Sequence, residues 1–252
     1  MNNKPKVLLV GESWMSLGTH VKGFNEFPTG FYEEGHTALS TALSEQFDVE
    51  HLPAHLASTR FPESVDELSR YAVVLFSDIG SDTLLLHPDT FIRYTPRPNR
   101  LRVVKEYVEA GGGFGMIGGY MSFAGFGGKA HYHATPVEEI LPVDILPYDD
   151  RVEVPEGFSP EVVDPTHPIV SQVSGAWPVL LGYNRLVPKP EGTVVLQHQS
   201  DPILAVRSVG RGRTLAFASD CAPHWGSVEF TEWSQYSVFW NAAVRWLAGN
   251  EG

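Results

Sequence analysis

Short apolar runs alternate with segments of helical spacing along the first half of the chain. Three such runs predict β-strands, at residues 7–10, 71–76 and 114–117, and residues 48–52 form a further short predicted strand. Helical spacing of apolar residues occurs at residues 31–47, 65–68 and 101–110. The first run, Val7-Leu8-Leu9-Val10, is typical of a strand buried on both faces of a parallel sheet, and we expect it to be the central strand. The alternation predicts an α/β fold with a doubly wound, mostly parallel sheet.

The second half of the chain has a different pattern. After Gly128, residues 137–140 form a predicted helical turn, and residues 143–154 are extended and broken by proline. Further strands are predicted at residues 193–196, 203–207 and 213–217, with a hairpin between the last two. A final helix is predicted at about residues 231–247. We therefore expect one domain over residues 1–252, with extra β-strands in its C-terminal half.

Three segments have weaker patterns. Residues 12–30 form a polar, glycine-containing segment, and residues 83–99 carry three prolines and are predicted to be a loop or surface cover. Residues 138–164 hold nine acidic residues against one basic residue, Arg151. We interpret this run as a solvated acidic edge, and a dock for a basic partner is the alternative.

Composition narrows the choice of partners and compartment. The formal net charge of −12 opposes a role built on neutralising phosphates, so we expect no nucleic-acid partner. No apolar run approaches the length of a membrane span, and residues 7–10 are too short for the core of a signal peptide. The single cysteine, Cys221, excludes an intramolecular disulfide. We expect a cytoplasmic protein with no membrane partner.

Residues 111–123 have the outline of a nucleophile elbow, with glycines around a sharp turn that follows a buried strand. Within it, Gly118-x-Tyr120-x-Ser122 places a tyrosine where acyl transfer requires cysteine or serine. Tyr120 is interpreted as a hydrogen-bond donor or a weak nucleophile, with a structural or ligand-contact role preferred. Ser122 would be the nucleophile only if the register of the turn slipped.

Polar residues follow several of the predicted strands. Because ligands of a doubly wound sheet lie beyond the carboxyl ends of its strands, Glu12, Asp78, Tyr120 and Asp220 are expected at one edge. Glu12 and Asp78 aim carboxylates at this crevice, or else they cap the next helix or turn. The remaining residues of interest lie around the last predicted strand and the turn, where Gly119 and Trp225 are candidate ligand contacts.

Histidine and cysteine add three further candidates. His224 follows the last buried strand with Asp220 close in sequence to orient it, and the alternative is a histidine packed beneath Trp225. Cys221 is expected to pack as a small hydrophobe. His131 and His133 would share one face of an extended segment, but no third ligand follows at a familiar spacing, so we expect crevice polarity and neither a metal nor a cofactor.

These segments together resemble the class I glutamine amidotransferase superfamily, in particular its "putative glutamine amidotransferase" branch near the ThuA-like proteins. The resemblance covers almost the whole chain. It rests on Val7 to Trp14, Phe76 to Gly80, Gly111 to Phe123, Asp164 to Ile169 and Ala218 to Gly226. It implies a flavodoxin-like fold and matches His224 to the histidine that these enzymes keep after a late strand. The chain departs from the family at the elbow cysteine, where it has Tyr120.

Two functions follow as hypotheses. The leading one is an amidotransferase-like protein without glutaminase activity that binds a small polar ligand or acts in assembly. Its candidate residues are Tyr120, His224 and Asp220 as catalytic groups, and Glu12, Asp78, Gly119, Ser122 and Trp225 as ligand contacts. The alternative is a hydrolase or isomerase acting on a sugar-like or amide substrate through His224 and Asp220. We also expect a homo-oligomer, because aromatic residues surround much of the final predicted helix.

Overall fold

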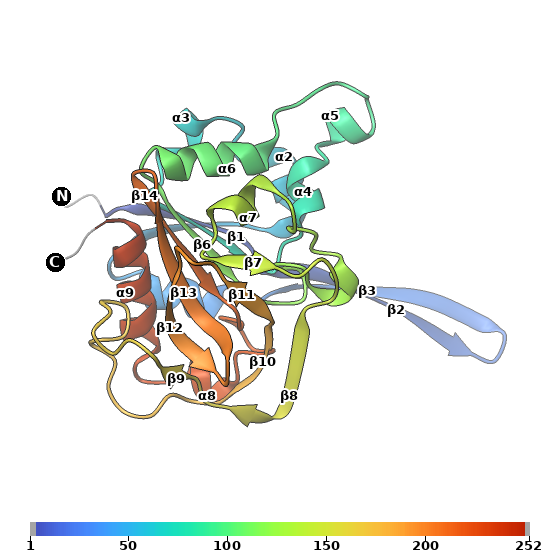
Figure 1. Ribbon diagram of the computed structural model, residues 1–252. Coiled ribbons are helices and arrows are strands. Elements are labelled where there is room, and N and C mark those ends of the chain that lie inside the picture. Colours follow the sequence, from blue (N-terminus) through green and yellow to red (C-terminus); the bar gives the residue numbers. More distant parts are fainter. Residues whose placement is uncertain (1–3, 250–252) are drawn as a thin grey trace.

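An eight-stranded sheet organises the part of the chain that the computed structural model describes, residues 4–249 (Figure 1). Its strand order is β4-β1-β5-β6-β14-β13-β12-β9. The strands are β4 (Asp48–Leu52), β1 (Lys6–Gly11), β5 (Val73–Ser77), β6 (Gly113–Ile117), β14 (Gly212–Phe217), β13 (Asp201–Val209), β12 (Thr193–His198) and β9 (Glu161–Val162).

The first five strands of this order are parallel. In chain order they read 2-1-3-4-5, which is the order of flavodoxin-like doubly wound folds. The predicted fold class is therefore confirmed. One detail was wrong: β1 is buried on both faces but lies second in the sheet, between β4 and β5, so it is not the central strand. A continuous apolar run reports burial and says nothing of how many strands follow on either side.

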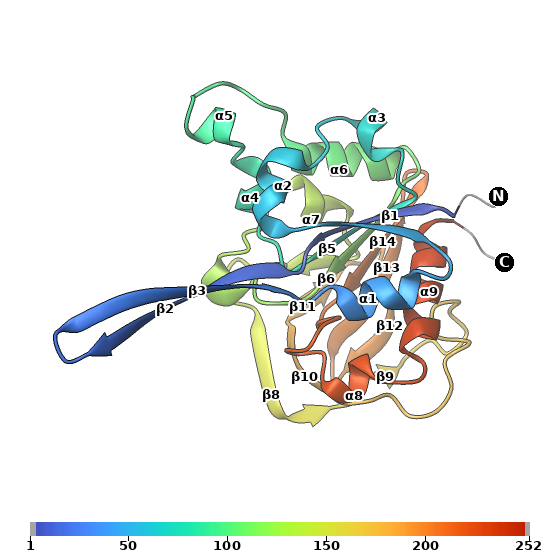
Figure 2. The ribbon, with the colours of Figure 1, turned by 180° about the vertical axis from the view of Figure 1, so that it is seen from behind.

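Helices cover both faces of the sheet. One layer contains α2 (Ala54–Arg60), α3 (Val65–Leu68), α4 (Ser81–Leu85), α6 (Arg100–Glu109) and α7 (Pro136–Ile140). The other layer pairs α1 (Thr37–Leu43) with α9 (Tyr236–Leu247), as Figure 2 shows from behind. The helix α6 begins where the Asn99 side chain accepts hydrogen bonds from the backbone N–H groups of Leu101 and Arg102, and it ends before Gly111. Both boundaries agree with the prediction.

The C-terminal half supplies the antiparallel part of the sheet. β13 pairs with β14, β12 with β13 and β9 with β12, all antiparallel. Two small sheets lie beside it, formed by β8 (Arg151–Phe158) with β10 (Leu180–Asn184) and by β7 (Val143–Ile145) with β11 (Leu186–Pro188). The extra strands predicted for this half are thus present. Residues 83–99 include the end of α4 and a short helix, α5 (Pro88–Phe91), in an otherwise irregular cover.

The largest difference from the sequence prediction is a long hairpin that projects from the body of the molecule (Figures 1 and 2). It consists of β2 (Ser13–Lys22) and β3 (Asn25–Glu34), joined at Gly23 and Phe24, and we call it the arm. The prediction of a helix over residues 31–47 was therefore wrong for its first part, because α1 begins only at Thr37. Both faces of the arm are exposed, so its sequence lacks the buried face by which a strand is recognised.

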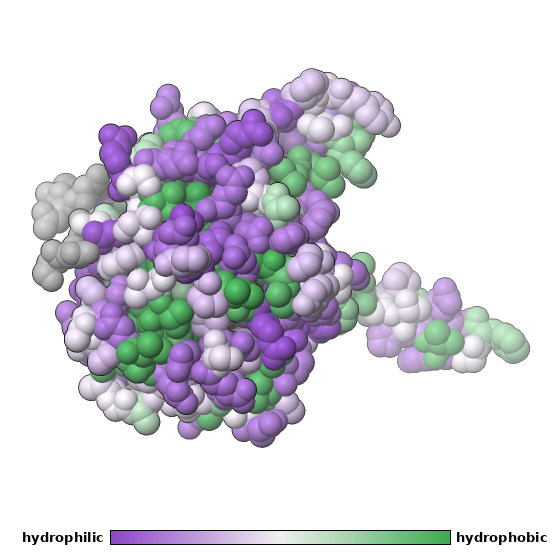
Figure 3. Space-filling view, viewed as in Figure 1, coloured by the Kyte–Doolittle hydropathy of each residue, from purple (hydrophilic) through white to green (hydrophobic). Residues whose placement is uncertain are grey.

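The final helix also begins later than predicted, because α8 (Val228–Thr231) is separate from α9. The aromatic side chains of α9 are covered within the chain: Trp240 is buried and its ring lies 5.3 Å from that of Phe217. The reason given above for an oligomer is therefore wrong. Exposed aromatic residues lie on the arm instead, where Phe24 and Phe31 face solvent, and Figure 3 shows the hydrophobic atoms at its tip. Among the described residues, no helix has the length and apolar character that crossing a membrane requires.

Candidate functional site

A cavity of about 340 Å³ opens at the carboxyl ends of the parallel strands. Its position is the switch point between β1 and β5, where doubly wound folds bind ligands. The side chains that line it are Glu12, Trp14, Asp78, Tyr120, Asp220, Pro223 and His224. The structure thus brings together the three carboxyl groups, the tyrosine and the histidine that the sequence placed at one edge. Trp14 was missed, because it lies on the unpredicted arm.

Glu12 and Asp78 have unusual backbone conformations. Each directly follows a parallel strand, and each has φ of 47°. The left-handed region is disfavoured for residues with a side chain, and where it persists it is held by the surrounding structure, often at a functional site. Here the backbone N–H of Glu12 donates a hydrogen bond of 2.8 Å to the carbonyl of Ser77, which ties the ends of β1 and β5 together. The two carboxyl groups therefore turn into the same cavity.

The carboxyl group of Glu12 is buried among groups that cannot neutralise it. Its Oε2 accepts a hydrogen bond of 2.5 Å from the Ser77 hydroxyl, and the Cys221 thiol lies 3.8 Å away. Burial raises the pKa of Glu12 well above its ordinary value, and the negative charges of Asp220 and Asp78 raise it further. The group consequently retains a proton at pH values where an exposed glutamate has lost it.

Two aspartates add further carboxyl groups to the cavity. Asp78 Oδ1 accepts a hydrogen bond of 2.6 Å from the backbone N–H of Met121, and Asp220 Oδ1 accepts one of 2.9 Å from that of Ala222. Burial raises the pKa of Asp78 and raises that of Asp220 well above its ordinary value, and in Asp220 the charge of Asp78 adds to the effect. Asp220 Oδ2 also lies 3.7 Å from Nδ1 of His224. The cavity can therefore offer both protonated and ionised carboxyl groups.

Tyr120 contacts its neighbours through its ring and hydroxyl. Its ring meets that of His224 edge to face at 4.3 Å, and its hydroxyl donates a hydrogen bond of 3.0 Å to Glu153. Burial, and then the Glu153 carboxylate, raise the pKa of Tyr120. The two predicted catalytic residues thus converge on the cavity without a hydrogen bond between them that would activate the phenol.

Only part of the predicted nucleophile elbow is present in the structure. Gly119 has φ of 149°, and a Cβ there would lie 2.8 Å from Asp78 Oδ1, so glycine is required. No helix follows the turn directly: within the described chain the next helical residues are a 3₁₀ turn at Phe126–Gly128. The sequence showed the glycines but could not show that the chain continues as a loop.

A buried network holds this loop. The Asp150 carboxylate accepts hydrogen bonds of 2.9 Å from the backbone N–H groups of both Ala124 and Gly125, and one of 2.7 Å from Asn184 Nδ2. Asn184 Oδ1 in turn accepts one of 3.1 Å from the N–H of Gly119. Asp150 belongs to the run interpreted as a solvated acidic edge, so that interpretation was wrong for this residue. Acidic residues in a run cannot be sorted by burial from sequence alone.

Three predicted ligand contacts lie behind the cavity wall. Ser122 is buried, donates a hydrogen bond of 2.5 Å to the carbonyl of Ile117 and accepts one of 3.1 Å from the N–H of Asp78. Trp225 is buried and donates a hydrogen bond of 2.9 Å to Glu153. With Gly119, these residues support Tyr120 and Asp78 and do not line the cavity. Glu153 was missed because it lies on β8, far from the predicted edge.

The remaining candidate residues, a cysteine and two histidines, do not line this cavity. Cys221 is buried beside Glu12, and burial raises the pKa of its thiol well above the ordinary value. His131 is exposed, whereas Nδ1 of His133 lies 3.3 Å from Glu138 Oε1. The two histidines are not among the groups of metal-ligating side chains that converge within the described residues.

Comparisons with known proteins agree with this architecture. Residues 6–249 match a family model described as putative glutamine amidotransferase. The cytoplasmic protein STM3548 from Salmonella typhimurium is similar, with 45% sequence identity and a TM-score of 0.92, over 96% of this chain and 98% of that one. The cytoplasmic protein STM1381 from Salmonella typhimurium LT2 has 42% identity and a TM-score of 0.92, over 96% and 99% of the two chains. No curated protein matches.

Proposed function

The chain belongs to the putative glutamine amidotransferase family, and we propose that it binds a small polar ligand in the carboxyl-lined cavity and lacks glutaminase activity. One observation carries the proposal: Glu12 and Asp78, both in the left-handed conformation, turn their carboxyl groups into one cavity with Asp220. Three acids held together against mutual repulsion destabilise the empty site, and a ligand that hydrogen-bonds to them relieves this cost.

We expect no glutaminase activity because the cysteine thiol does not lie at the elbow. That reaction needs a thiolate at the elbow to form an acyl intermediate, and the elbow residue is Tyr120. Cys221 is buried with a raised pKa and does not line the cavity, so its thiol cannot replace the missing nucleophile.

The ligand class follows from the lining. Carboxyl groups that are part protonated and part ionised both donate and accept hydrogen bonds, which suits hydroxyl or amide groups. Trp14 and Tyr120 add aromatic faces beside them. A volume of about 340 Å³ fits a molecule of the size of a monosaccharide or a small amide. Because two similar proteins are described as cytoplasmic, we place this binding in the cytoplasm.

A second candidate function is general acid–base catalysis on such a ligand, as in a hydrolase or isomerase. The observation that favours it is the pair of His224 Nδ1 and Asp220 Oδ2, 3.7 Å apart, in the cavity that Glu12 and Asp78 also line. Carboxyl groups with raised pKa values in a cleft, here Glu12 and Asp220, are candidates for proton transfer, and His224 is the more exposed partner of Asp220.

Assembly with a second copy of this chain is supported by the arm. Met15, Leu17, Val21 and Tyr32 lie on one of its faces, since opposed residues of an antiparallel pair share a face. An isolated two-stranded hairpin is marginal in water, so this face needs a cover. It runs into a hollow of about 820 Å³, lined in part by Met15, Tyr32, Leu86 and Phe91. Two arms lying side by side in opposite directions would each place an apolar tip at the partner's hollow.

Binding is tested by thermal-shift screening of separate polyol, sugar, amide and amine sets. We expect a polyol, sugar or amide to raise the midpoint of the wild-type protein, because a ligand specific for the folded state stabilises it by mass action. The shift should be lost in Asp78→Asn and kept in Asp66→Asn, an exposed carboxyl on α3. Turnover of the hit, abolished by His224→Ala, would establish the catalytic candidate. A hit whose shift survives Asp78→Asn would contradict binding in this cavity.

A further inference from the structure

Outside the cavity, a second group of side chains converges at the foot of the arm. Glu34 is the last residue of β3, His36 precedes α1 and His51 lies on β4. Each offers one ligand atom, and these atoms lie within 4.8 Å of one another. The two imidazole rings stack with centroids 3.7 Å apart, and Nε2 of His36 lies 3.3 Å from Oε2 of Glu34. We propose that Glu34, His36 and His51 bind a divalent transition-metal ion of the zinc class.

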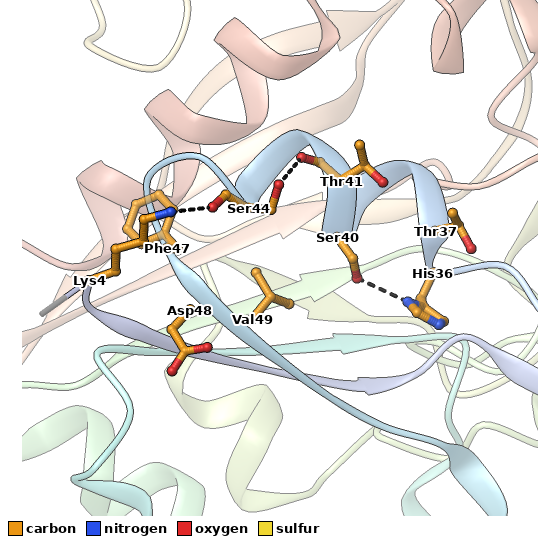
Figure 4. Close-up of a pocket in the computed structure, with 9 residues that line it drawn as sticks. All are labelled: Lys4, His36, Thr37, Ser40, Thr41, Ser44, Phe47, Asp48 and Val49. Carbon is orange, nitrogen blue, oxygen red and sulfur yellow. Dashed lines mark hydrogen bonds between the residues drawn. The ribbon is translucent and has the colours of Figure 1, made fainter.

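Hydrogen bonds hold each of the three side chains at one atom, and the two stacked imidazole rings, tilted by 25°, would turn relative to each other to direct one nitrogen each at a shared ion. Nε2 of His51 donates a hydrogen bond of 2.8 Å to the carbonyl of Gly11, so its Nδ1 carries the free lone pair. Nδ1 of His36 is 3.0 Å from the Ser40 hydroxyl (Figure 4), and Nε2 of the same ring is the nitrogen near Glu34. Tyr32 donates a hydrogen bond of 2.6 Å to Glu34 Oε1, while Oε2 contacts Nε2 of His36 at 3.3 Å, a contact that an ion between the two atoms would replace. Metal-binding histidines are typically held in this way through their second nitrogen.

The donor set indicates the kind of metal. Two imidazoles and one carboxylate suit zinc and its neighbours, cobalt, nickel and copper, whereas calcium and magnesium prefer oxygen ligands alone. Three protein ligands leave a further coordination position for water or another ligand. His36 borders a hollow of about 680 Å³ between α1 and β4, drawn in Figure 4, which gives an ion a route to the site.

A metal ion at this site would join three elements of the fold. A bound ion would fasten the end of β3 to β4 and to the start of α1. Between two of the ligands, the N–H of Gly35 donates a hydrogen bond of 2.9 Å to the carbonyl of Glu12, and a Cβ on Gly35 would lie 2.5 Å from Glu12 Oε1. The ion would therefore fix the segment that supports the carboxyl-lined cavity, without taking a ligand from it.

The test uses the full chain, freed of any affinity tag and of metal by chelation and dialysis. Zn²⁺ and Co²⁺ are titrated separately by isothermal calorimetry, and visible absorption is recorded for the cobalt form. We expect one equivalent to bind, with visible bands of cobalt bound through nitrogen and oxygen. His36→Ala and His51→Ala should each weaken binding by at least about tenfold, the lower end of the losses seen even for residues that only support a ligand.

Two variants serve as controls. His133→Ala removes another imidazole that lies 3.3 Å from a carboxylate, and it should leave binding unchanged. Cys221→Ser alters the other convergent group, formed by Glu12, Asp220 and Cys221, and should also have no effect. Glu34→Gln keeps the shape of the side chain. Weaker metal binding by this variant, with an unchanged circular dichroism spectrum, would show that the loss of a ligand and not misfolding weakens binding. Absent binding, binding unaffected by the histidine changes, or a thiolate-to-cobalt band lost in Cys221→Ser would overturn the proposal.

Discussion

The Tyr120 hydroxyl donates its hydrogen bond to a carboxylate on another sheet, Oε1 of Glu153, whose Oε2 accepts from the indole N–H of Trp225. Glu153 thus holds the residue at the elbow position and the tryptophan beside His224 in one arrangement. Because burial, and then the Glu153 carboxylate, raise the pKa of Tyr120, its phenol is a neutral hydrogen-bond donor and a poor nucleophile.

The purified protein should therefore release no ammonia from glutamine above background. Tyr120→Phe and Cys221→Ser should give the same result as the wild type, because neither group supplies a thiolate at the cavity. A coupled glutamate dehydrogenase assay, with a known glutaminase as positive control, measures this directly. Glutamine hydrolysis that disappears in either variant would contradict the expectation.

The buried acids make stability depend on pH. Asp220 has a raised pKa in the folded state, so the folded protein holds a proton that the unfolded chain loses above about pH 4. Stability from this group is present below that pH and is lost as the pH rises through the folded-state pKa. Asp220→Asn should therefore increase the free energy of unfolding at about pH 8, by about 1.4 kcal/mol for each unit of pKa elevation removed, and much less at about pH 4.

Urea denaturation across this pH range measures the effect. The amide oxygen of the variant can still accept from the N–H of Ala222, so that contact is kept. Asp66→Asn, an exposed change, should leave the pH profile as in the wild type. A variant that is destabilised more at high pH than at low pH would show that Asp220 is ionised and stabilising in the folded protein.

Arg100 joins three helices through their backbone. Its buried guanidinium donates to four carbonyls, those of Leu84, Ala57, Ser58 and Thr83, at the ends of α2 and α4. Arg100→Met keeps the stem and removes the donors, although the carbonyl of Ala57 still accepts a hydrogen bond from the N–H of Phe61. We expect a loss of about 3 kcal/mol or more, since each buried carbonyl left unpaired costs about 1–3 kcal/mol. Arg97→Met, which breaks an exposed ion pair with Glu63, should change stability by less than about 1 kcal/mol. Equal effects in the two variants would contradict the role assigned to Arg100.

The arm should make the protein a dimer in solution. Light scattering is expected to give twice the chain mass of 27.8 kDa at micromolar concentration. Leu17→Ser with Val21→Ser should shift it toward the monomer, because both side chains lie on the apolar face, while Thr19→Ser between them on the same face should not. A wild-type monomer would remove the argument, and a dimer insensitive to the double change would place the interface elsewhere.

The sequence predicted the strands of the main sheet better than the hairpin that projects from it. The runs at 71–76 and 114–117 were recognised as strands because buried parallel strands are apolar at nearly every position, whatever they pack against. The arm was missed because Leu17, Phe24 and Phe31 have no buried partner face within the chain, so no alternation marks them as strand.

The positions of the candidate residues could be predicted where topology alone decides, and could not where folding joins distant segments. Glu12, Asp78 and Asp220 could be placed because each follows a parallel strand, and such strand ends meet at one edge. Glu153 lies on β8 of a separate small sheet, and Asp150 directly precedes β8. The local sequence gives no sign of how this small sheet packs against the main sheet. The convergence of His36 with His51 depends on where the chain turns after the arm, and that turn was itself mispredicted.

A single residue, Glu12, separates the last residue of β1 from the first residue of β2. The direction of the arm thus depends on the backbone at Glu12, which is a pivot in the wall of the cavity. Ten residues of strand span about 33 Å, so a turn of about 5° at the pivot moves the tip by about 3 Å. Any partner that fixes the tip in one direction selects a backbone angle at Glu12, and any molecule that hydrogen-bonds to Glu12 selects a direction of the arm. Because linkage between two binding events is reciprocal, occupancy of the cavity and capture of the arm must strengthen or weaken each other by the same factor.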